Sequence, residues 1–92
     1  MLTEQQREAL AGKAATARIH YLLAHNPKEY ARMKMSGELK EHLDLIGSQA
    51  ADHYDTLMTQ MREGASLRGE TPNEAQMSFS AWELTIADIV HF

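Results

Sequence analysis

The side chains that could do chemistry here are histidines and carboxylates, because the 92 residues include five histidines and 13 acidic residues but no cysteine. The histidines are His20, His25, His42, His53 and His91. They form no His-x3-His pair and no Glu-x-x-His motif, which are spacings that zinc and di-iron sites use on helices. Glu38 and His42 stand four residues apart, as an ordinary exposed helical pair does. We therefore expect no metal site and no cofactor.

Nucleophilic catalysis has equally little support. The serines have no Gly-x-Ser-x-Gly context, and Gly64 and Gly69 lack the Gly-Lys-Ser/Thr ending of a phosphate-binding loop. His53 stands among apolar residues at helical spacing, which is typical of a core or interface histidine rather than of a base. If it were buried, association would depend on pH. We expect a protein that is not an enzyme.

The elements that position these residues are predicted to be helices in one domain, residues 1–92. The chain is 43% apolar, carries only two prolines and five glycines, and is too short for a second core. The predicted fold class is all-α, a small elongated bundle of three long helices and one short helix with up-down connections. The expected helices cover about 3–25, 27–35, 37–62 and 72–91, with a flexible loop over 63–70.

Capping residues mark these boundaries. Thr3 with Gln6 forms a capping box, and Asn26 before a proline caps the short helix. Thr71 before another proline is expected to cap the last helix. Gly12 lies inside the first helix, which suggests a closely approached backbone or a frayed first half.

Apolar residues recur at heptad-like spacing in the third and last helices. A third helix of that length spans roughly 38 Å, whereas a compact domain of this size is about 32 Å across. The molecule must be elongated, or a second chain must cover part of this helix. We expect a homodimer. The candidate self-association seam comprises Leu43, Ile46, His53, Leu57, Trp82 and Ile86.

Charge is distributed unevenly along the chain. Residues 1–40 carry seven basic and four acidic side chains, and residues 41–92 carry two and nine. The two halves could neutralise each other inside the fold, or either could meet a partner. The candidate nucleic-acid contacts are Lys13, Arg18, Lys28, Arg32 and Lys34. An acidic pI of about 5.7 and the lack of an arginine-rich run weaken this candidate.

The N-terminal residues show no basic and apolar signal-peptide pattern, and the apolar runs are only a few residues long. We expect a cytoplasmic protein without a membrane span.

The order of several short motifs resembles the TnpV family, small proteins encoded on transposons and conjugative elements. Over residues 17–62 the resemblance rests on Tyr21-Leu22, His25-Asn26-Pro27, Tyr30, Met35-Ser36-Gly37-Glu38-Leu39, Gln49-Ala50 and Met58-Thr59-Gln60-Met61. In the last helix, Gln76-Met77 and Ala87-Asp88-Ile89-Val90 are similar to two further family motifs. These two stand about one helical turn closer together than in the family, and the Asn-Asn-Ile-Arg stretch between them is missing.

The resemblance implies a helical, non-catalytic accessory protein of a mobile element, with a protein partner expected and nucleic acid as a possible one. In one hypothesis the basic helices contact DNA or the recombination machinery. In another, the protein is a small acidic inhibitor of the anti-CRISPR type that occupies the basic groove of a nucleic-acid-processing effector. Its contact residues would be Asp44, Asp52, Asp55, Glu63, Glu70 and Glu74. A third hypothesis is self-association or scaffolding through the seam.

Overall fold

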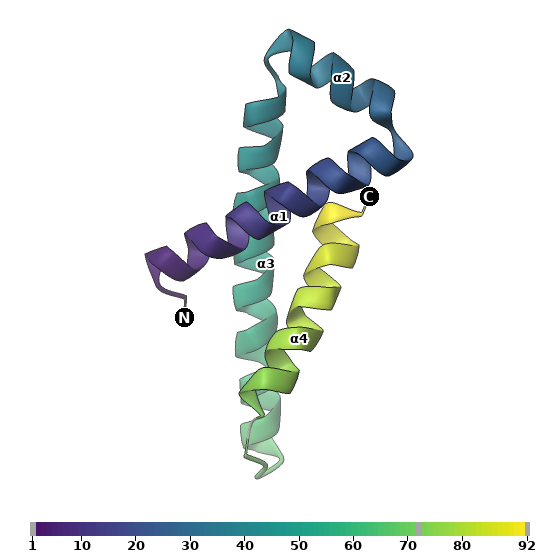
Figure 1. The fold of residues 1–92 in the computed structure, drawn as a ribbon. Helices are drawn as coiled ribbons and strands as arrows, with labels where there is room; N and C mark the ends of the chain where they lie inside the picture. Colours follow the sequence, from purple (N-terminus) through teal and green to yellow (C-terminus); the bar gives the residue numbers. More distant parts are fainter. Residues whose placement is uncertain (1, 72, 92) are drawn as a thin grey trace.

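A computed structural model describes residues 2–71 and 73–91 of the chain (Figure 1). Every regular element in these ranges is helical, and the protein is therefore all-α. The elements are α1 (Glu4–His25), α2 (Pro27–Ser36), α3 (Leu39–Leu67), α4 (Glu74–Thr85) and a π-helical turn, η1 (Ile86–Val90).

Side-chain caps determine where the first two helices begin. The hydroxyl of Thr3 accepts a hydrogen bond from the backbone N–H of Gln6, whose side-chain oxygen accepts one from the N–H of Thr3. The side-chain oxygen of Asn26 accepts from the N–H of Glu29, which caps α2. Gly37 ends α2 with a φ of 83°, a left-handed conformation that glycine adopts without steric cost.

The third helix continues beyond the expected boundary. The flexible loop expected over 63–70 is wrong for residues 63–67, because α3 extends to Leu67. Gly64 lies within the helix, and Ala65 is buried. Burial of Ala65 favours continuation of the helix, and Gly69, just beyond the end of α3, adopts the positive φ of a turn.

The expected cap of the last helix is also corrected. Asn73, not Thr71, caps α4, because the side-chain oxygen of Asn73 accepts a hydrogen bond of 3.2 Å from the N–H of Gln76. Asparagine is among the best N-cap residues, and its position three residues before Gln76 suits this bond. The expected first helical residue, Pro72, and the terminal Phe92 lie outside the described residues.

Figure 1 shows α1 running obliquely across the middle of α3, whereas up-down connections would place the two helices alongside each other. The short α2 leads the chain back to the start of α3, and α4 returns along the second half of α3. A Cβ atom built on Gly47 would lie 2.9 Å from the Cβ of Ala11. Small residues at this crossing allow the two backbones to approach closely.

Two apolar clusters hold these helices together. The first is built from buried Ala14 of α1, Ile46 and Ala50 of α3, and Val90 of η1. The second is built from buried Tyr54, Met58 and Ala81, and joins α3 to α4. The side chain of Trp82 packs against both clusters. The core is therefore continuous along α3.

The molecule is elongated, as its helix lengths require. Its radius of gyration is 15.2 Å and its principal extents are 52 × 25 × 15 Å. A compact chain of this length would have a radius of gyration of about 12 Å. A 29-residue α3, roughly 43 Å long at 1.5 Å per residue, determines the long axis.

Candidate functional site

The five candidate nucleic-acid contacts do not form one patch. Arg18 is only 5% exposed, and the ammonium of Lys13 lies 4.6 Å from the ring centre of Trp82. The guanidinium of Arg32 pairs with Glu29 at 2.5 Å and Glu38 at 2.9 Å. Lys28 and Lys34 are exposed on α2. The last two are the members of the group placed best to meet a phosphate, since the other three are engaged within the chain.

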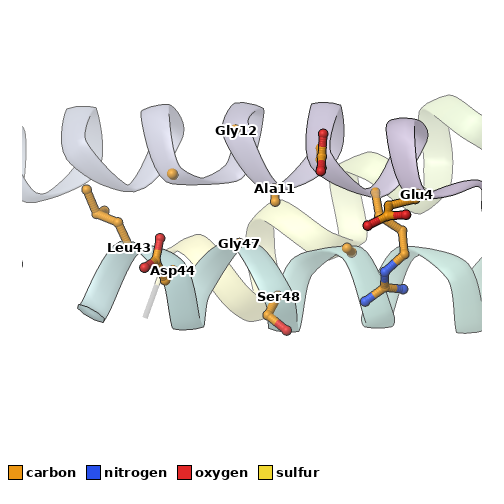
Figure 2. A pocket seen from close by; sticks show the side chains of 11 residues that line it. Glu4, Ala11, Gly12, Leu43, Asp44, Gly47 and Ser48 are labelled. Atoms are coloured by element: carbon orange, nitrogen blue, oxygen red, sulfur yellow. The ribbon is translucent and has the colours of Figure 1, made fainter. Parts of the chain in front are cut away.

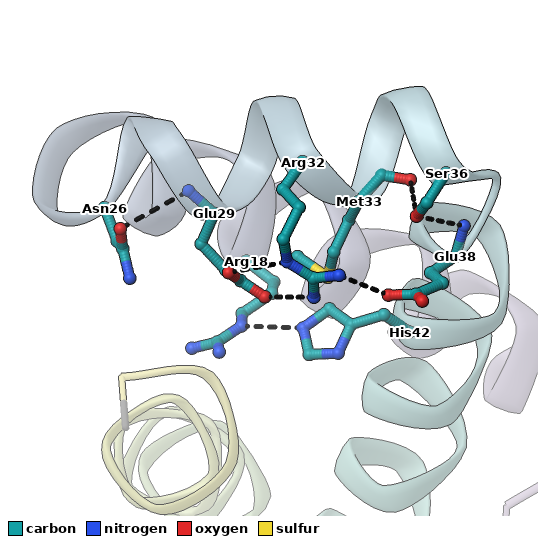
Figure 3. Close-up of polar contacts among 8 residues, drawn as sticks. All are labelled: Arg18, Asn26, Glu29, Arg32, Met33, Ser36, Glu38 and His42. Carbon is teal, nitrogen blue, oxygen red and sulfur yellow. Dashed lines mark hydrogen bonds and ion pairs between the residues drawn. The ribbon is translucent and has the colours of Figure 1, made fainter.

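Arg18 is instead part of the core. Its Nη1 donates a hydrogen bond of 2.6 Å to the carbonyl of Val90, and its Nε donates one of 3.2 Å to Nε2 of His42 (Figure 3). Its guanidinium lies 5.4 Å from the ring centre of Tyr21. Burial lowers the pKa of Arg18 from its ordinary value, and Tyr21 opposes this shift. Arg18 thus connects α1, α3 and the C-terminal turn.

His42 shares this environment. Burial is the larger cause that lowers its pKa, and the positive charge of Arg18 lowers it further. The carboxylate of Glu29 acts in the opposite direction. The burial of Arg18 follows from helical spacing, because Arg18 stands four residues after Ala14 and four before Leu22, both of which are buried.

Ion pairs neutralise the neighbouring corner of α2. The hydrogen bonds from Arg32 lower the pKa of Glu29, and the two carboxylates, Glu29 first and Glu38 second, raise the pKa of Arg32. Figure 3 shows the guanidinium between the two glutamates, over the side chain of buried Met33. Such exposed pairs fix local geometry more than they add stability.

The acidic candidates are spread over α3 and the α3–α4 connection. Several are paired on the surface: Asp44 with Lys40, Asp52 with Arg7, Glu70 with Arg68, and Glu74 with Arg62. Asp55 is half-buried and Glu63 is exposed. Asp44, Asp52, Asp55 and Glu63 share one side of α3, because their spacings of eight, three and eight residues keep them within about 100° around the helix axis.

The residues of the candidate self-association seam make contacts within one chain, but only Ile46 of the six is fully buried. Ile46 is buried, and Trp82 and Ile86 pack on the cluster to which it belongs. Leu57 packs on the second cluster, and Leu43 is half-buried at the α1 crossing. The Nε2 of His53 lies 3.0 Å from a carboxylate oxygen of Asp88, which joins α3 to η1. The heptad spacing therefore reflects, at least in part, contacts made within one chain.

A groove at the α1–α3 crossing escaped the sequence analysis. It has a volume of about 410 Å³ and lies between the two helices, as Figure 2 shows. Small and apolar residues form its floor: Ala11, Gly12, Ala15, Leu43, Gly47, Ser48 and Ala51. Charged residues stand at its rim: Glu4, Arg7, Glu8 and Asp44. Pairs of small residues, Ala11-Gly12 on one helix and Gly47-Ser48 on the other, were the signal that could have revealed it.

Two further features bear on the kind of site. Among residues 2–71 and 73–91, no three histidine, aspartate or glutamate side chains are grouped to hold a metal ion. In the same ranges, no helix combines the length and the apolarity needed to cross a lipid bilayer.

Helices that cross at small residues, with a groove between them, define an all-α protein. Over residues 1–89 the sequence matches the profile of one family, described as transposon-encoded protein TnpV. The chain belongs to this family. Neither a curated protein nor a solved structure matches the chain significantly. The match extends the motif resemblance of residues 17–62 to nearly the whole chain.

Proposed function

We propose that this transposon-encoded chain is a non-catalytic accessory protein that binds a protein partner in the cytoplasm through the groove between α1 and α3. The observation that carries the proposal is the composition of this groove. Its floor is made of small and apolar residues, and its rim holds Glu4, Glu8 and Asp44 with a single cation, Arg7. Arg7 is itself paired with Asp52 at 2.5 Å. The surface thus suits an apolar segment flanked by basic side chains.

The distribution of cations supports a protein partner over a nucleic acid. Arg18 and Arg32 are held by groups of their own chain, and Lys13 lies against Trp82. A protein that binds phosphates needs several exposed cations on one face. This chain presents mainly Lys28 and Lys34 on the short α2.

Gly12 provides a way to test the groove, because a Cβ built on it meets no atom within 4 Å. Replacement of Gly12 by leucine adds a bulky side chain at a position that lines the groove. We expect Gly12→Leu to lose a specific nuclease-resistant protein that co-purifies with the wild-type chain from cells carrying the transposon. Ala24→Leu is the matched control, since Ala24 is exposed on the same helix and does not line the groove.

The same experiment, carried out with nuclease, distinguishes binding to a protein partner from binding to DNA. If nuclease removes all the co-purifying material from the wild-type chain, the protein-binding proposal fails. Direct DNA contact is then the better hypothesis, and its residues are Lys28 and Lys34. In that case Lys28→Glu with Lys34→Glu should abolish duplex binding, and the binding should weaken steeply with salt.

A second candidate function is inhibition of a nucleic-acid-processing effector of the anti-CRISPR type. It is favoured by the four acidic residues on one side of α3, which extend over about 29 Å of a continuous helix. Such a row offers negative charge to the basic groove of an effector. Asp55→Lys with Glu63→Lys should abolish this inhibition and leave groove binding unchanged.

Self-association remains part of the proposal, although the residues of the candidate seam already make contacts within one chain. The accessible surface of 6124 Å² exceeds the roughly 5,400 Å² expected for a compact protein of this mass. Phe79 is 65% exposed on α4, and Leu84 of the same helix is 44% exposed. Native mass spectrometry of the wild type and Phe79→Ser tests whether these side chains contribute to a dimer.

A further inference from the structure

Arg18 holds the π-helical segment η1 through a hydrogen bond, and His42 contacts the same guanidinium. Nη1 of Arg18 donates to the carbonyl of Val90, and Nε of the same guanidinium donates to Nε2 of His42. An arginine N–H can only donate, so Nε2 of His42 must carry a lone pair. The contact therefore exists only while the imidazole of His42 is neutral, with its proton on Nδ1.

Water reaches this histidine from an open pocket of about 440 Å³ between α2 and α3. The charged side chains that line it come from three helices: Arg18 of α1, Glu29 and Arg32 of α2, Glu41 and His42 of α3, and Glu38 just before α3. Glu29 is the carboxylate that would favour a protonated His42, but it is held by Arg32 in a two-pronged ion pair. A proton from the solvent can therefore reach His42. The carboxylates of Glu29 and Glu38 near it are engaged in ion pairs with Arg32.

The segment whose Val90 carbonyl accepts a hydrogen bond from Arg18 is the π-helical turn η1. The N–H of His91 donates to the carbonyl of Ile86, five residues earlier, and Val90 is fully buried in the first cluster. The ring of His91 stacks on Tyr21, with 4.8 Å between ring centres. Short π-helical segments are uncommon and often occur at functional positions. Loss of the Arg18 contact would leave a buried carbonyl poorly satisfied.

We propose that the Arg18–His42 contact is a proton-operated clasp on residues 86–91. Protonation of His42 replaces its lone pair with an N–H and sets two cations at hydrogen-bond distance. Arg18 then withdraws from His42 and from the Val90 carbonyl, and η1 loosens from its contacts with α1 and α3 in the first cluster. The loosened turn exposes Ile86, Ile89 and Val90, which are apolar side chains of the first cluster.

A second histidine of α3 contacts the same turn. The Nε2 of His53 lies 3.0 Å from the Asp88 carboxylate. The clasp and this pair can be told apart by substitution, because they involve different histidines of α3.

Amide hydrogen exchange of residues 86–91 at pH 7.5 and 5.5, corrected for the intrinsic exchange rates, tests the clasp. We expect protection of this segment to fall between pH 7.5 and pH 5.5 in the wild type, because protonation of His42 removes the acceptor of the Arg18 hydrogen bond. His42→Gln keeps an oxygen that can accept from Arg18 but does not titrate, so its protection should not change with pH. His20→Gln is the control, because His20 is exposed on α1, and it should behave as the wild type.

An equal loss of protection in His42→Gln would overturn the proposal. A second measurement covers the case in which His42→Gln folds poorly. In a wild-type NMR titration, the amide shifts of residues 86–91 should follow the midpoint of the His42 imidazole. If these amides follow His53, His91 or His25 instead, the clasp is wrong.

Discussion

Gly47 of α3 faces Ala11 of α1 at the point where the two helices cross. A Cβ built on Gly47 would lie 2.9 Å from the Ala11 Cβ and 3.0 Å from the Ala11 carbonyl oxygen. Backbone atoms cannot move away as the end of a flexible side chain can. The crossing therefore requires glycine at position 47.

We predict that Gly47→Ala destabilises the fold by about 1–3 kcal/mol through overpacking, despite the better helix propensity of alanine. Gly12→Ala is the matched control on the other helix, since nothing lies within 4 Å of a Cβ there. It should stabilise the fold by about 0.5–1 kcal/mol. Urea unfolding followed by circular dichroism measures both changes. Equal changes in the two variants would refute the close crossing.

A second prediction concerns the buried guanidinium of Arg18. Arg18→Met preserves much of the side-chain volume but removes the donors to Val90 and His42, which should cost about 1.5–3 kcal/mol. The pKa of His42 should rise in this variant, because the repulsion from Arg18 disappears, and should stay below its ordinary value, because burial persists. NMR titration of the imidazole measures this shift. An unchanged His42 pKa would contradict the contact.

The hydrogen bond between Tyr54 and Ser78 links α3 to α4 at 2.5 Å between the two oxygens. Tyr54→Phe and Ser78→Ala should each destabilise the fold by about 1 kcal/mol. The double variant should lose less than the sum of the two single losses, since both remove the same bond. A double-mutant cycle of unfolding free energies gives the coupling. Strict additivity would show that the two hydroxyls do not interact.

The pair formed by Arg62 and Glu74 predicts how stability changes in acid. The hydrogen bonds from Arg62 lower the pKa of Glu74 below its ordinary value of 4.5. The stabilisation from this pair is therefore fully present above pH 4.5 and disappears as the pH falls through the lowered pKa. Glu74→Gln should flatten this part of the stability profile between pH 5 and pH 3. Thermal unfolding across that range, compared with Glu63→Gln on the same tip of the molecule, provides the measurement.

The helix starts that depend on local side chains could be predicted from the sequence, as Thr3 and Asn26 show. The end of α3 could not, because Gly64 looks like a helix breaker in isolation, and the burial of Ala65 is visible only in the folded structure. The close approach of two backbones also fell at another glycine. Gly12 suggested a close approach or a frayed first half, but the close approach lies at Gly47, since the place where α1 crosses α3 depends on distant parts of the chain.

The candidate binding surfaces could also be predicted from the sequence only in part. Lys28 and Lys34 could be placed on an exposed basic helix from spacing alone. Arg18 was counted with them by charge, although its position between Ala14 and Leu22 on the buried stripe indicated the opposite. The groove needs two helices to form, so neither sequence segment could reveal it separately.

The 52 Å length of this 10.4 kDa chain has a hydrodynamic consequence. A rod-like particle experiences more friction than a sphere of equal mass, so the monomer will leave a size-exclusion column ahead of compact standards of the same mass. Its elution volume alone would therefore suggest a dimer. Sedimentation equilibrium, which is independent of shape, is the measurement that distinguishes an extended single chain from a genuine pair.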